Sequence, residues 1–352
     1  MRIVLQSSLI LAFGTIVRMP SAMVRGPAAE APPGAAEEAL VLDAETSEPP
    51  PADPPRTDSV ILVVLDGARW QEVLVATDPR FATGEDRGVL ASALMPNLHQ
   101  MIADGSAVGA PGHGPPMVAT GPNFISLPGY NEIFSGQSPS FCADNECPAT
   151  RRPTVVDEVR ARSLDVAVFS SWAPIVRAAA LHPSDIVWST GEPVTGAFRP
   201  DRATADLALA YLSSNHPSFL FVGLGEPDEY AHRSDYAGYL GSLRQADAVL
   251  GELQEHLAQM GERGRRTSVF VTCDHGRSDD FRDHGAPWPE SSRVWLVGAG
   301  GAIPARGYVD SMRGHHLADI APTVRALLDL PADESSGSPG VGSPIEELLP
   351  AR

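Results

Sequence analysis

Six acidic and imidazole side chains of the sequence stand directly after, or shortly before, short apolar runs. They are Asp66, Asp228, His232, Asp274, His275 and His284. Taken singly, each has an ordinary explanation, because an aspartate after an apolar run is often a turn or cap residue, and an acid and a histidine four residues apart often form a surface pair. Taken together, carboxylates and imidazoles collected at one place are the ligands that two zinc-like ions require. We therefore expect a metal site.

Ser126 is the candidate nucleophile for chemistry at such a site. It lies two residues before Pro128, at the start of a short predicted helix, and proline suits the first turn of a helix. This position predicts that Ser126 is the N-cap residue, and capping alone would explain it. The alternative is that a metal ion lowers the pKa of its hydroxyl, while free backbone amides of the helix receive a phosphate oxygen. Ser135 is the competing serine, but it lies a turn or more into the helix, where packing is its expected role.

Strands and helices alternate along the part of the chain that carries these residues. Apolar, β-branched runs predict buried strands at 60–65, 166–169, 219–222, 269–271 and 294–297. Helical patterns predict helices at 95–103, 154–162, 203–212, 236–260 and 317–328. This alternation indicates an α/β fold, in which a mostly parallel central sheet is covered on both faces as a three-layer α/β/α sandwich. Ligands of such sheets bind at the carboxyl ends of the strands, where the six side chains are expected to meet.

Composition excludes several other classes of protein. The chain has 352 residues and a formal net charge of −18, contains arginine but no lysine, and has 3 cysteines. So large an excess of carboxylates repels a phosphate backbone, which argues against a nucleic-acid polymer as partner. Three cysteines are too few for a disulfide-scaffolded miniprotein or a four-cysteine zinc module. A small phosphate-containing substrate stays compatible with this charge, since bound metal cations can reverse the local field.

The two ends of the chain differ in composition from its middle. Residues 3–17 are mostly apolar but shorter than the roughly 20 residues of a membrane span, so 1–25 is predicted to be an export signal, with an uncleaved anchor as the alternative. Residues 26–57 are rich in Pro, Ala and Glu and are predicted to be a disordered linker. The folded domain is expected over 58–332, followed by a flexible tail over 333–352. An exported chain would be periplasmic or extracellular, with membrane contact only through an uncleaved N-terminal segment.

Other candidate residues have simpler explanations. Cys142 and Cys147 flank a short loop, and in an oxidising compartment we expect a local disulfide rather than two free thiols. Cys273 is expected to be an inert buried residue, with a thiolate ligand as the alternative. His315 and His316 could add a metal ligand, but the expected role is to support other ligands or to cap a helix.

The candidate residues also occur in a recognisable order. The phrases are Leu65-Asp66-Gly67, Ser126-Leu127-Pro128, Asp228-x-x-x-His232, Asp274-His275-Gly276 and His284-Gly285. This ordered set resembles the alkaline phosphatase superfamily, and within it the type I phosphodiesterase/nucleotide pyrophosphatase branch. The resemblance extends over nearly the whole of residues 58–330 and implies an alkaline phosphatase-like fold.

The resemblance also implies a site and a reaction. The ligands of one zinc ion would be Asp66, Ser126, Asp274 and His275, and those of the other would be Asp228, His232 and His284. Two divalent ions, expected to be Zn²⁺, would support hydrolysis of a small phosphate ester through a phosphoserine intermediate on Ser126. A phosphomonoesterase on the same site is one alternative to a phosphodiesterase or pyrophosphatase. A catalytically silent metal-binding domain of the cell envelope is another.

Several features depart from the patterns of the related families. The phosphodiesterase branch has threonine where this chain has Ser126, and asparagine where it has Gly129. Support for a phosphoryl oxygen would then have to come from the metals, from backbone amides, or from a side chain such as Asn123 or Asn131. Tyr130 stands where sulfatases have arginine, which disfavours a sulfatase. Cofactor-independent phosphoglycerate mutases carry a large inserted domain, for which the interval after the serine is too short.

Overall fold

The computed structural model of the protein describes residues 56–191, 198–333 and 335–351. The export signal or anchor predicted over 1–25 lies outside the described residues, and so does the predicted linker 26–57 except for its last two positions. Within the described part of the chain, no helix combines the length and the apolar composition that a membrane span would need.

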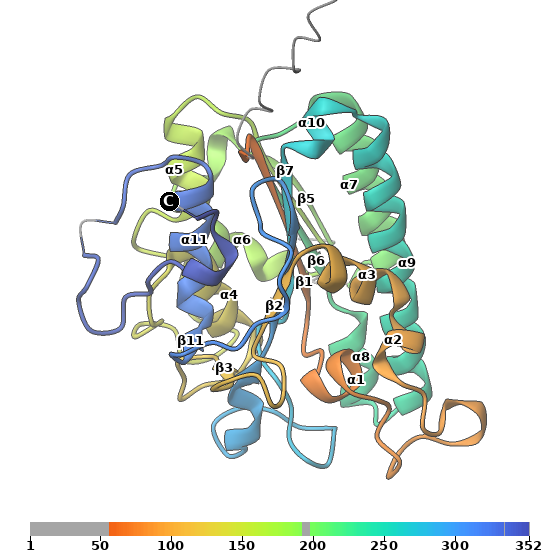
Figure 1. Cartoon of the computed structure of the whole chain (residues 1–352). Coiled ribbons are helices and arrows are strands. Elements are labelled where there is room, and N and C mark those ends of the chain that lie inside the picture. Colours follow the sequence, from red (N-terminus) through yellow and green to blue (C-terminus); the bar gives the residue numbers. More distant parts are fainter. Residues whose placement is uncertain (1–55, 192–197, 334, 352) are drawn as a thin grey trace, which may run out of the picture. The chain divides into compact units, whose positions relative to one another are not determined.

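An eight-stranded sheet forms the centre of the domain (Figure 1). Its strands, in spatial order, are β10 (Gly307–Tyr308), β2 (Ser106–Val108), β9 (Leu296–Gly300), β7 (Thr267–Thr272), β1 (Ser59–Leu65), β6 (Phe219–Leu224), β4 (Val166–Ser170) and β5 (Val187–Thr190). Strand β9 runs antiparallel to both of its neighbours, and the other neighbouring pairs are parallel. The prediction of a mostly parallel sheet is confirmed.

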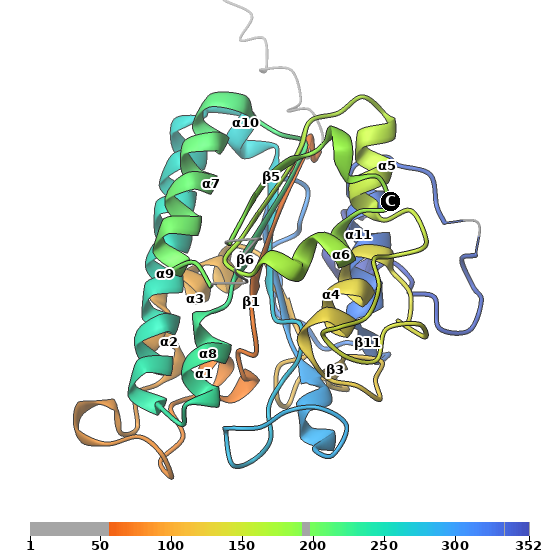
Figure 2. The same ribbon diagram turned by 180° about the vertical axis from the view of Figure 1, so that it is seen from behind.

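Helices cover both faces of this sheet (Figures 1 and 2). One face carries α3 (Pro96–Asp104), α7 (Asp201–Asn215) and α9 (Tyr236–Gln259), and the other carries α4 (Ser126–Ser135), α5 (Val155–Ala161), α6 (Val176–Ala179) and α11 (Ile320–Leu327). Residues 60–65 of β1 are at most 1% exposed, as expected for a central strand that is covered on both sides. The predicted three-layer α/β/α sandwich is confirmed.

Shorter elements surround the sandwich. The short helices are α1 (Trp70–Leu74), α2 (Ala91–Leu94), α8 (Glu226–His232) and α10 (Glu262–Arg265). A second, three-stranded sheet has the order β11 (His315–His316), β3 (Met117–Val118) and β8 (Arg293–Val294). Turns of 3₁₀ helix lie at Gly84–Asp86, Ala173–Ile175, Pro183–Asp185, Pro289–Ser292, Leu317–Asp319 and Glu346–Leu348.

The predicted strand at 294–297 is divided between the two sheets. Strand β8 ends at Val294, and β9 begins at Leu296. The residue between them, Trp295, is fully buried, and its Nε1–H donates to the carbonyl of Ala68 at 3.0 Å. Strands β2, β5 and β10 were not predicted, because segments of 3, 4 and 2 residues carry too little periodicity.

The carboxyl-terminal segment packs against the domain, so the prediction of a flexible tail over 333–352 was wrong for part of its length. Ile345 and Leu348 have no exposed surface. The N–H of Ile345 donates to Thr323 Oγ1 on α11 at 2.9 Å, and the N–H of Gly342 donates to the carbonyl of Gly136 at 2.9 Å. A few apolar anchors within a Ser-, Gly- and Pro-rich segment are enough to dock it, and composition does not reveal them.

A buried acid, Glu132, ties α4 to two neighbouring segments. Its carboxylate accepts hydrogen bonds from the backbone N–H groups of Thr120 (2.9 Å) and Ala318 (3.2 Å). Burial raises the pKa of Glu132 to about 7 despite these hydrogen bonds, and nearby Asp319 contributes in the same direction.

We expect the free energy of unfolding of the metal-free protein to fall as pH rises from 5 to 8. The folded state holds the proton of Glu132 more tightly than the unfolded chain does, and this difference stabilises the folded protein. The stabilisation is complete below the pKa of Glu132 in the unfolded chain and is lost as pH rises through about 7. Asp201, whose pKa burial also raises to about 7, acts in the same direction. The loss from Glu132 would be about 3 kcal/mol at most. Urea unfolding in the presence of a chelator, at pH 5 and at pH 8, measures this change in the free energy of unfolding. The change should be smaller for Glu132→Gln. A wild-type free energy of unfolding that rises from pH 5 to pH 8 would contradict the prediction.

Candidate metal centre

The central strands of the sheet end side by side, and the candidate ligands follow them. Strand β1 is parallel to β6 on one side and to β7 on the other. Asp66 directly follows β1, Asp274 follows β7 after one intervening residue, and Asp228 lies on α8, which follows β6. The parallel arrangement therefore brings residues from three distant parts of the chain to one edge of the sheet, as expected for this class of fold.

Helix α8 is held at its first residues by the buried acid Asp201. Its carboxylate accepts hydrogen bonds from the N–H groups of Gly225 (2.8 Å) and Glu226 (2.9 Å). Asp228 and His232 lie four residues apart on α8, and His232 Nε2 is 3.1 Å from Asp228 Oδ2. Fixing the start of α8 therefore fixes the position of both side chains.

Asp66, Asp274 and His275 form what we call the first ligand set. One ligand atom of each lies within 4.8 Å of the others. His275 Nε2 is 3.5 Å from Asp66 Oδ1 and 3.6 Å from Asp274 Oδ2. Ser126 faces this set, since its Oγ lies 3.4 Å from Asp66 Oδ1 and 3.4 Å from His275 Nε2. The structure thus brings together the four residues predicted to hold the first zinc ion.

Two further hydrogen bonds orient the first ligand set. His275 Nδ1 lies 2.8 Å from the carbonyl of Gly276, which it can only approach as a donor, so Nε2 is left with its lone pair toward Asp66 and Ser126. The hydroxyl of Tyr130 donates to Asp66 Oδ2 at 3.0 Å. Tyr130 therefore supports a candidate ligand.

The electrostatics of the first ligand set favour a cation between its members. Burial raises the pKa of Asp66 well above its usual range, and Asp228 contributes; burial and Asp66 do the same to the pKa of Asp274. Asp274 Oδ1 accepts from the N–H of Gly67 at 3.0 Å, but its buried Oδ2 has no hydrogen-bond partner among the described residues. Facing carboxylates with an unpartnered oxygen are costly to bury unless a cation joins them. These residues fit a divalent metal ion.

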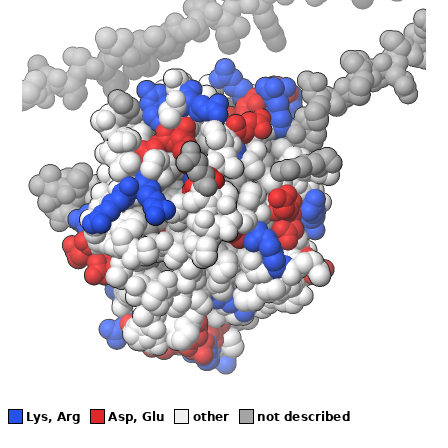
Figure 3. Space-filling model, turned by 90° about the vertical axis from the view of Figure 1, so that its left-hand side faces the viewer, with Lys and Arg blue, Asp and Glu red and all other residues white. Residues whose placement is uncertain are grey.

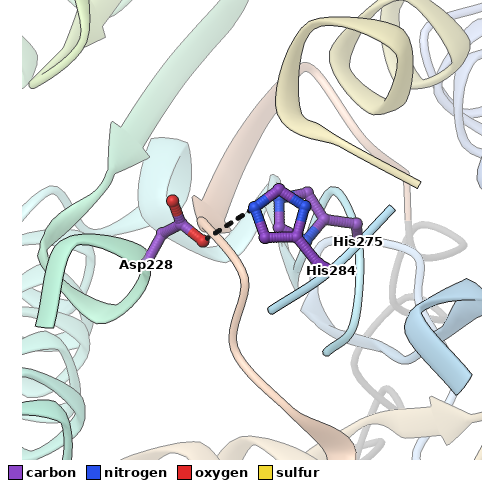
Figure 4. Close-up of side chains that lie close together, drawn as sticks. All are labelled: Asp228, His275 and His284. Carbon is purple, nitrogen blue, oxygen red and sulfur yellow. Dashed lines mark ion pairs between the residues drawn. The ribbon is translucent and has the colours of Figure 1, made fainter. Parts of the chain in front are cut away.

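Asp228, His232 and His284 form the second ligand set, beside the first. His284 Nε2 is 3.7 Å from Asp228 Oδ1 and 3.0 Å from His232 Nε2. Figure 4 shows His284 stacked on His275, with ring centroids 4.0 Å apart, and directed toward Asp228. Burial, with His275 beside it, lowers the pKa of His284 to about 2, so this imidazole is neutral and can act as a ligand. The structure brings these three residues together as well.

Arg277 belongs to this region although the sequence analysis did not single it out. It forms an ion pair through Nη1 with Asp228 Oδ1, and its side chain has no exposed surface. Burial by itself would raise the pKa of Asp228, but Arg277 and His232 hold that pKa well below its usual range. The available signal was its position directly after Gly276, which places it at the same strand end as His275.

Ser126 is the first residue of α4 rather than its N-cap, which is Ile125. The predicted capping role was therefore wrong by one position, because the helical turn already closes on Ile125, whose carbonyl accepts from the N–H of Gly129 at 3.0 Å. The hydroxyl of Ser126 is directed at the first ligand set instead.

The predicted disulfide lies next to the start of α4. Cys142 and Cys147 are bonded to each other. The loop that they close contains Asn145, whose Oδ1 accepts from the N–H of Leu127 at 2.9 Å. The disulfide loop thereby holds the backbone directly after Ser126.

The departure at position 129 has a structural reason. A Cβ atom at Gly129 would lie 2.2 Å from the carbonyl oxygen of Asp274, so α4 can approach the strand end only with glycine at this position. An asparagine side chain there would not fit. Asn131 Nδ2 donates to the carbonyl of Leu127 at 2.9 Å, so this amide is committed inside the helix and does not replace the missing one.

The remaining candidates have partners of their own. His315 is buried between Asp319 (3.4 Å) and Glu347 (3.3 Å), and His316 caps the 3₁₀ turn that begins at Leu317. Ser135 Oγ donates to the carbonyl of Asn131 at 2.6 Å within α4, as expected for a packing role. Cys273 is a free, buried cysteine.

Comparison with known proteins identifies a family model and distant relatives. Residues 172–332 match the model described as the Metalloenzyme superfamily. The chain is 30% identical over 135 residues to a 2,3-bisphosphoglycerate-independent phosphoglycerate mutase of Rippkaea orientalis. This match covers 36% of the chain and 24% of the relative, so the chain spans about a quarter of the length of the curated relative.

Solved structures of several hydrolases share the fold. A putative sulfatase from Bacteroides thetaiotaomicron has a TM-score of 0.61 at 14% identity, covering 85% of this chain and 75% of its own. The phosphonate monoester hydrolase of Agrobacterium radiobacter has a TM-score of 0.58 at 16% identity, covering 83% and 77%. Murine ectonucleotide pyrophosphatase/phosphodiesterase 5 has a TM-score of 0.58 at 12% identity, covering 83% and 100%.

Proposed function

The chain belongs to the alkaline phosphatase superfamily, and from that premise we propose that it is a metal-dependent hydrolase of small phosphate esters, similar to phosphodiesterases and pyrophosphatases. Membership supports metal-dependent phosphoryl or sulfuryl transfer in general. The observation that carries the more specific proposal is the place of Ser126, whose Oγ lies 3.4 Å from both Asp66 and His275. A hydroxyl beside buried metal-type ligands is placed to act as an activated nucleophile.

The first ligand set, with Ser126 Oγ, would hold one divalent ion, and zinc is the proposed metal because mixed oxygen and nitrogen donors suit it. When bound, such an ion lowers the pKa of the hydroxyl and stabilises charge on the phosphoryl group. Ser126 Oγ gives up its proton and forms a bond to phosphorus while the bond to the leaving oxygen breaks and that oxygen takes up a proton, which gives a phosphoserine. Water then loses a proton and bonds to phosphorus while the bond to Ser126 breaks and Ser126 Oγ regains a proton. Tyr130 keeps Asp66 oriented throughout, and Asn145 holds the backbone after the nucleophile.

The second ligand set offers one carboxylate and two imidazoles. These are enough, together with an open position, for the second zinc ion that the family resemblance implies. Its carboxylate is, however, already paired with Arg277. The occupancy of the second set is therefore a question separate from the identity of the nucleophile.

We also propose that the substrate is a small ester and that the protein works outside the cytoplasm. The net charge of −18 disfavours a polyanionic partner. On the face shown in Figure 3, arginine and acidic side chains are intermixed among uncharged surface. The disulfide between Cys142 and Cys147 supports an oxidising compartment, periplasmic or extracellular.

Steady-state kinetics of the zinc-loaded protein tests this proposal. The substrates are 4-nitrophenyl esters with the same leaving group: a phosphate monoester, an alkyl phosphate diester and a sulfate. We expect turnover of the phosphate esters, with the higher kcat/KM for the diester. A higher value for the monoester would favour the phosphomonoesterase alternative, and turnover of the sulfate alone would contradict phosphate ester hydrolysis. Absence of turnover of all three esters by protein that has bound metal would favour the alternative that this is a catalytically silent metal-binding domain.

A further inference from the structure

Arg277 places a positive charge inside the second ligand set. Its Nη1 is paired with Asp228 Oδ1, and the exposed fractions of the two side chains are 0% and 14%. A guanidinium carries a positive charge, and it has no lone pair to offer a metal. Arg277 is therefore a fixed cation at the place where the second metal ion is expected.

Two backbone carbonyls hold this guanidinium where it is. Its Nε donates to the carbonyl of Phe281 at 2.7 Å, and its Nη2 donates to the carbonyl of Arg282 at 2.5 Å. On another side, a Cβ at Gly67 would lie 2.6 Å from Arg277 Nη1 and 2.7 Å from Asp228 Oδ1. Only a residue without a Cβ atom leaves room here for the ion pair of Arg277 and Asp228. Gly67 has none, and its backbone is at φ +59°.

The loop that supplies the two carbonyls is itself anchored. The ring of Phe281 is buried against Tyr236 and Tyr239, with centroid distances of 4.9 Å and 4.8 Å. Moving Arg277 away from Asp228 would therefore require the loop to move with it, or would leave two backbone carbonyls without their donor. The ion pair is part of the folded structure.

We propose that Arg277 takes the place of the second metal ion, so that the protein holds one divalent cation, in the first ligand set, instead of two. This inference rests on the proposed function, because it concerns the metal content of the same site. It revises the count of two ions that the family resemblance implies.

Electrostatic repulsion disfavours a second ion. An ion in the second ligand set would bind an oxygen of Asp228, and zinc–oxygen bonds are about 2 Å long. The ion would then share one small carboxylate with a guanidinium that has no exposed surface. Two cations this close to each other repel strongly. One divalent ion and Arg277 together already balance the three carboxylates of Asp66, Asp228 and Asp274, and a second ion would leave a large excess of positive charge.

Arg277 acts in this scheme as a positioning residue. It holds Asp228 Oδ1, while Asp228 Oδ2 binds His232 at 3.1 Å. His232 and His284 then face the site as hydrogen-bonding imidazoles instead of ligands of a second ion. A site whose charges balance suits a phosphodiester, which carries one negative charge, better than a monoester, which carries two.

The number of zinc ions bound per chain tests the inference. The full-length protein is dialysed against a series of buffered free-zinc concentrations, and bound zinc is measured by elemental analysis. We expect one equivalent for the wild type and for Arg282→Met, a matched control that removes an exposed arginine from the same loop. Arg277→Met keeps the length of the side chain and removes its charge, so it should bind a second equivalent. Arg277→Lys keeps a positive charge and should stay at one.

Two further variants locate the ion, and they also test the inference if Arg277→Met does not fold. Asp66→Asn should lose the ion, whereas His232→Ala, which alters the second ligand set at a half-exposed side chain, should keep it. Near-ultraviolet circular dichroism checks the fold of each variant. If Arg277→Met does not fold, this pair decides: zinc retained in His232→Ala supports the inference, and zinc lost there overturns it.

Two equivalents of zinc on the wild type would overturn the inference, and so would a single equivalent on folded Arg277→Met. Absence of zinc from the wild type would instead overturn the proposed function, because that function requires the first ligand set to hold an ion. The two failures are therefore distinguishable.

Discussion

Replacing Ser126 with alanine is expected to lower kcat on a phosphate ester by a factor of about 10⁴ or more, while the zinc content stays the same. The variant removes the proposed attacking atom. Asp66, Asp274 and His275 remain to hold the ion, since their ligand atoms lie within 4.8 Å of one another without Ser126. The fold should not suffer, because the hydroxyl does not cap α4.

Ser135→Ala is the matched control for this measurement. Ser135 lies on the same helix, and its Oγ donates to the carbonyl of Asn131 at 2.6 Å and accepts from the N–H of Gln137 at 3.1 Å. Kinetics and elemental analysis of both variants should show normal turnover for Ser135→Ala and normal zinc for both. Turnover of Ser126→Ala at the rate of the wild type would exclude Ser126 as the nucleophile.

Replacing Asp274 with asparagine is expected to have opposite effects on metal binding and on the stability of the metal-free protein. Zinc binding and turnover should be lost, because a negative ligand is removed from the first ligand set. The metal-free variant should nevertheless be at least as stable as the metal-free wild type. Burial and Asp66 raise the pKa of Asp274, which means that its negative charge is unfavourable in the folded protein without a cation.

Thermal unfolding with and without zinc measures this prediction. Wild-type protein should gain about 4 kcal/mol at zinc concentrations near a thousand times Kd, and Asp274→Asn should gain little. Asp279→Asn, an exposed acid of the same loop, is the control and should respond as the wild type does. A metal-free Asp274→Asn protein that is clearly less stable than the wild type would show that Asp274 is a structural acid. Its negative charge would then be stabilised by the folded protein without a cation.

The central strands and the acidic and imidazole residues that follow them could be recognised from the amino-acid sequence. Long β-branched runs are local signals, and β1, β6 and β7 were each predicted from such a run. Because parallel strands have their carboxyl ends at one edge, the position of Asp66, Asp228 and Asp274 along the chain was enough to predict that they meet. Order in the sequence and the rules of parallel sheets determined this part of the site.

The pairing of Arg277 with Asp228, the need for Gly129 and the docking of Ile345 became visible only in the folded protein. Each depends on the distance between backbone segments that are far apart in the sequence. Gly129 is needed because a Cβ atom at this position would lie 2.2 Å from the carbonyl oxygen of Asp274, and no local pattern in the sequence records that approach. A sequence specifies which charges reach the edge of a sheet, but which of them pair there depends on packing at the scale of single atoms. The sequence motifs did not determine which cation lies beside the carboxylate of the second ligand set. The tertiary structure decided it, because packing places the guanidinium of Arg277 against Asp228.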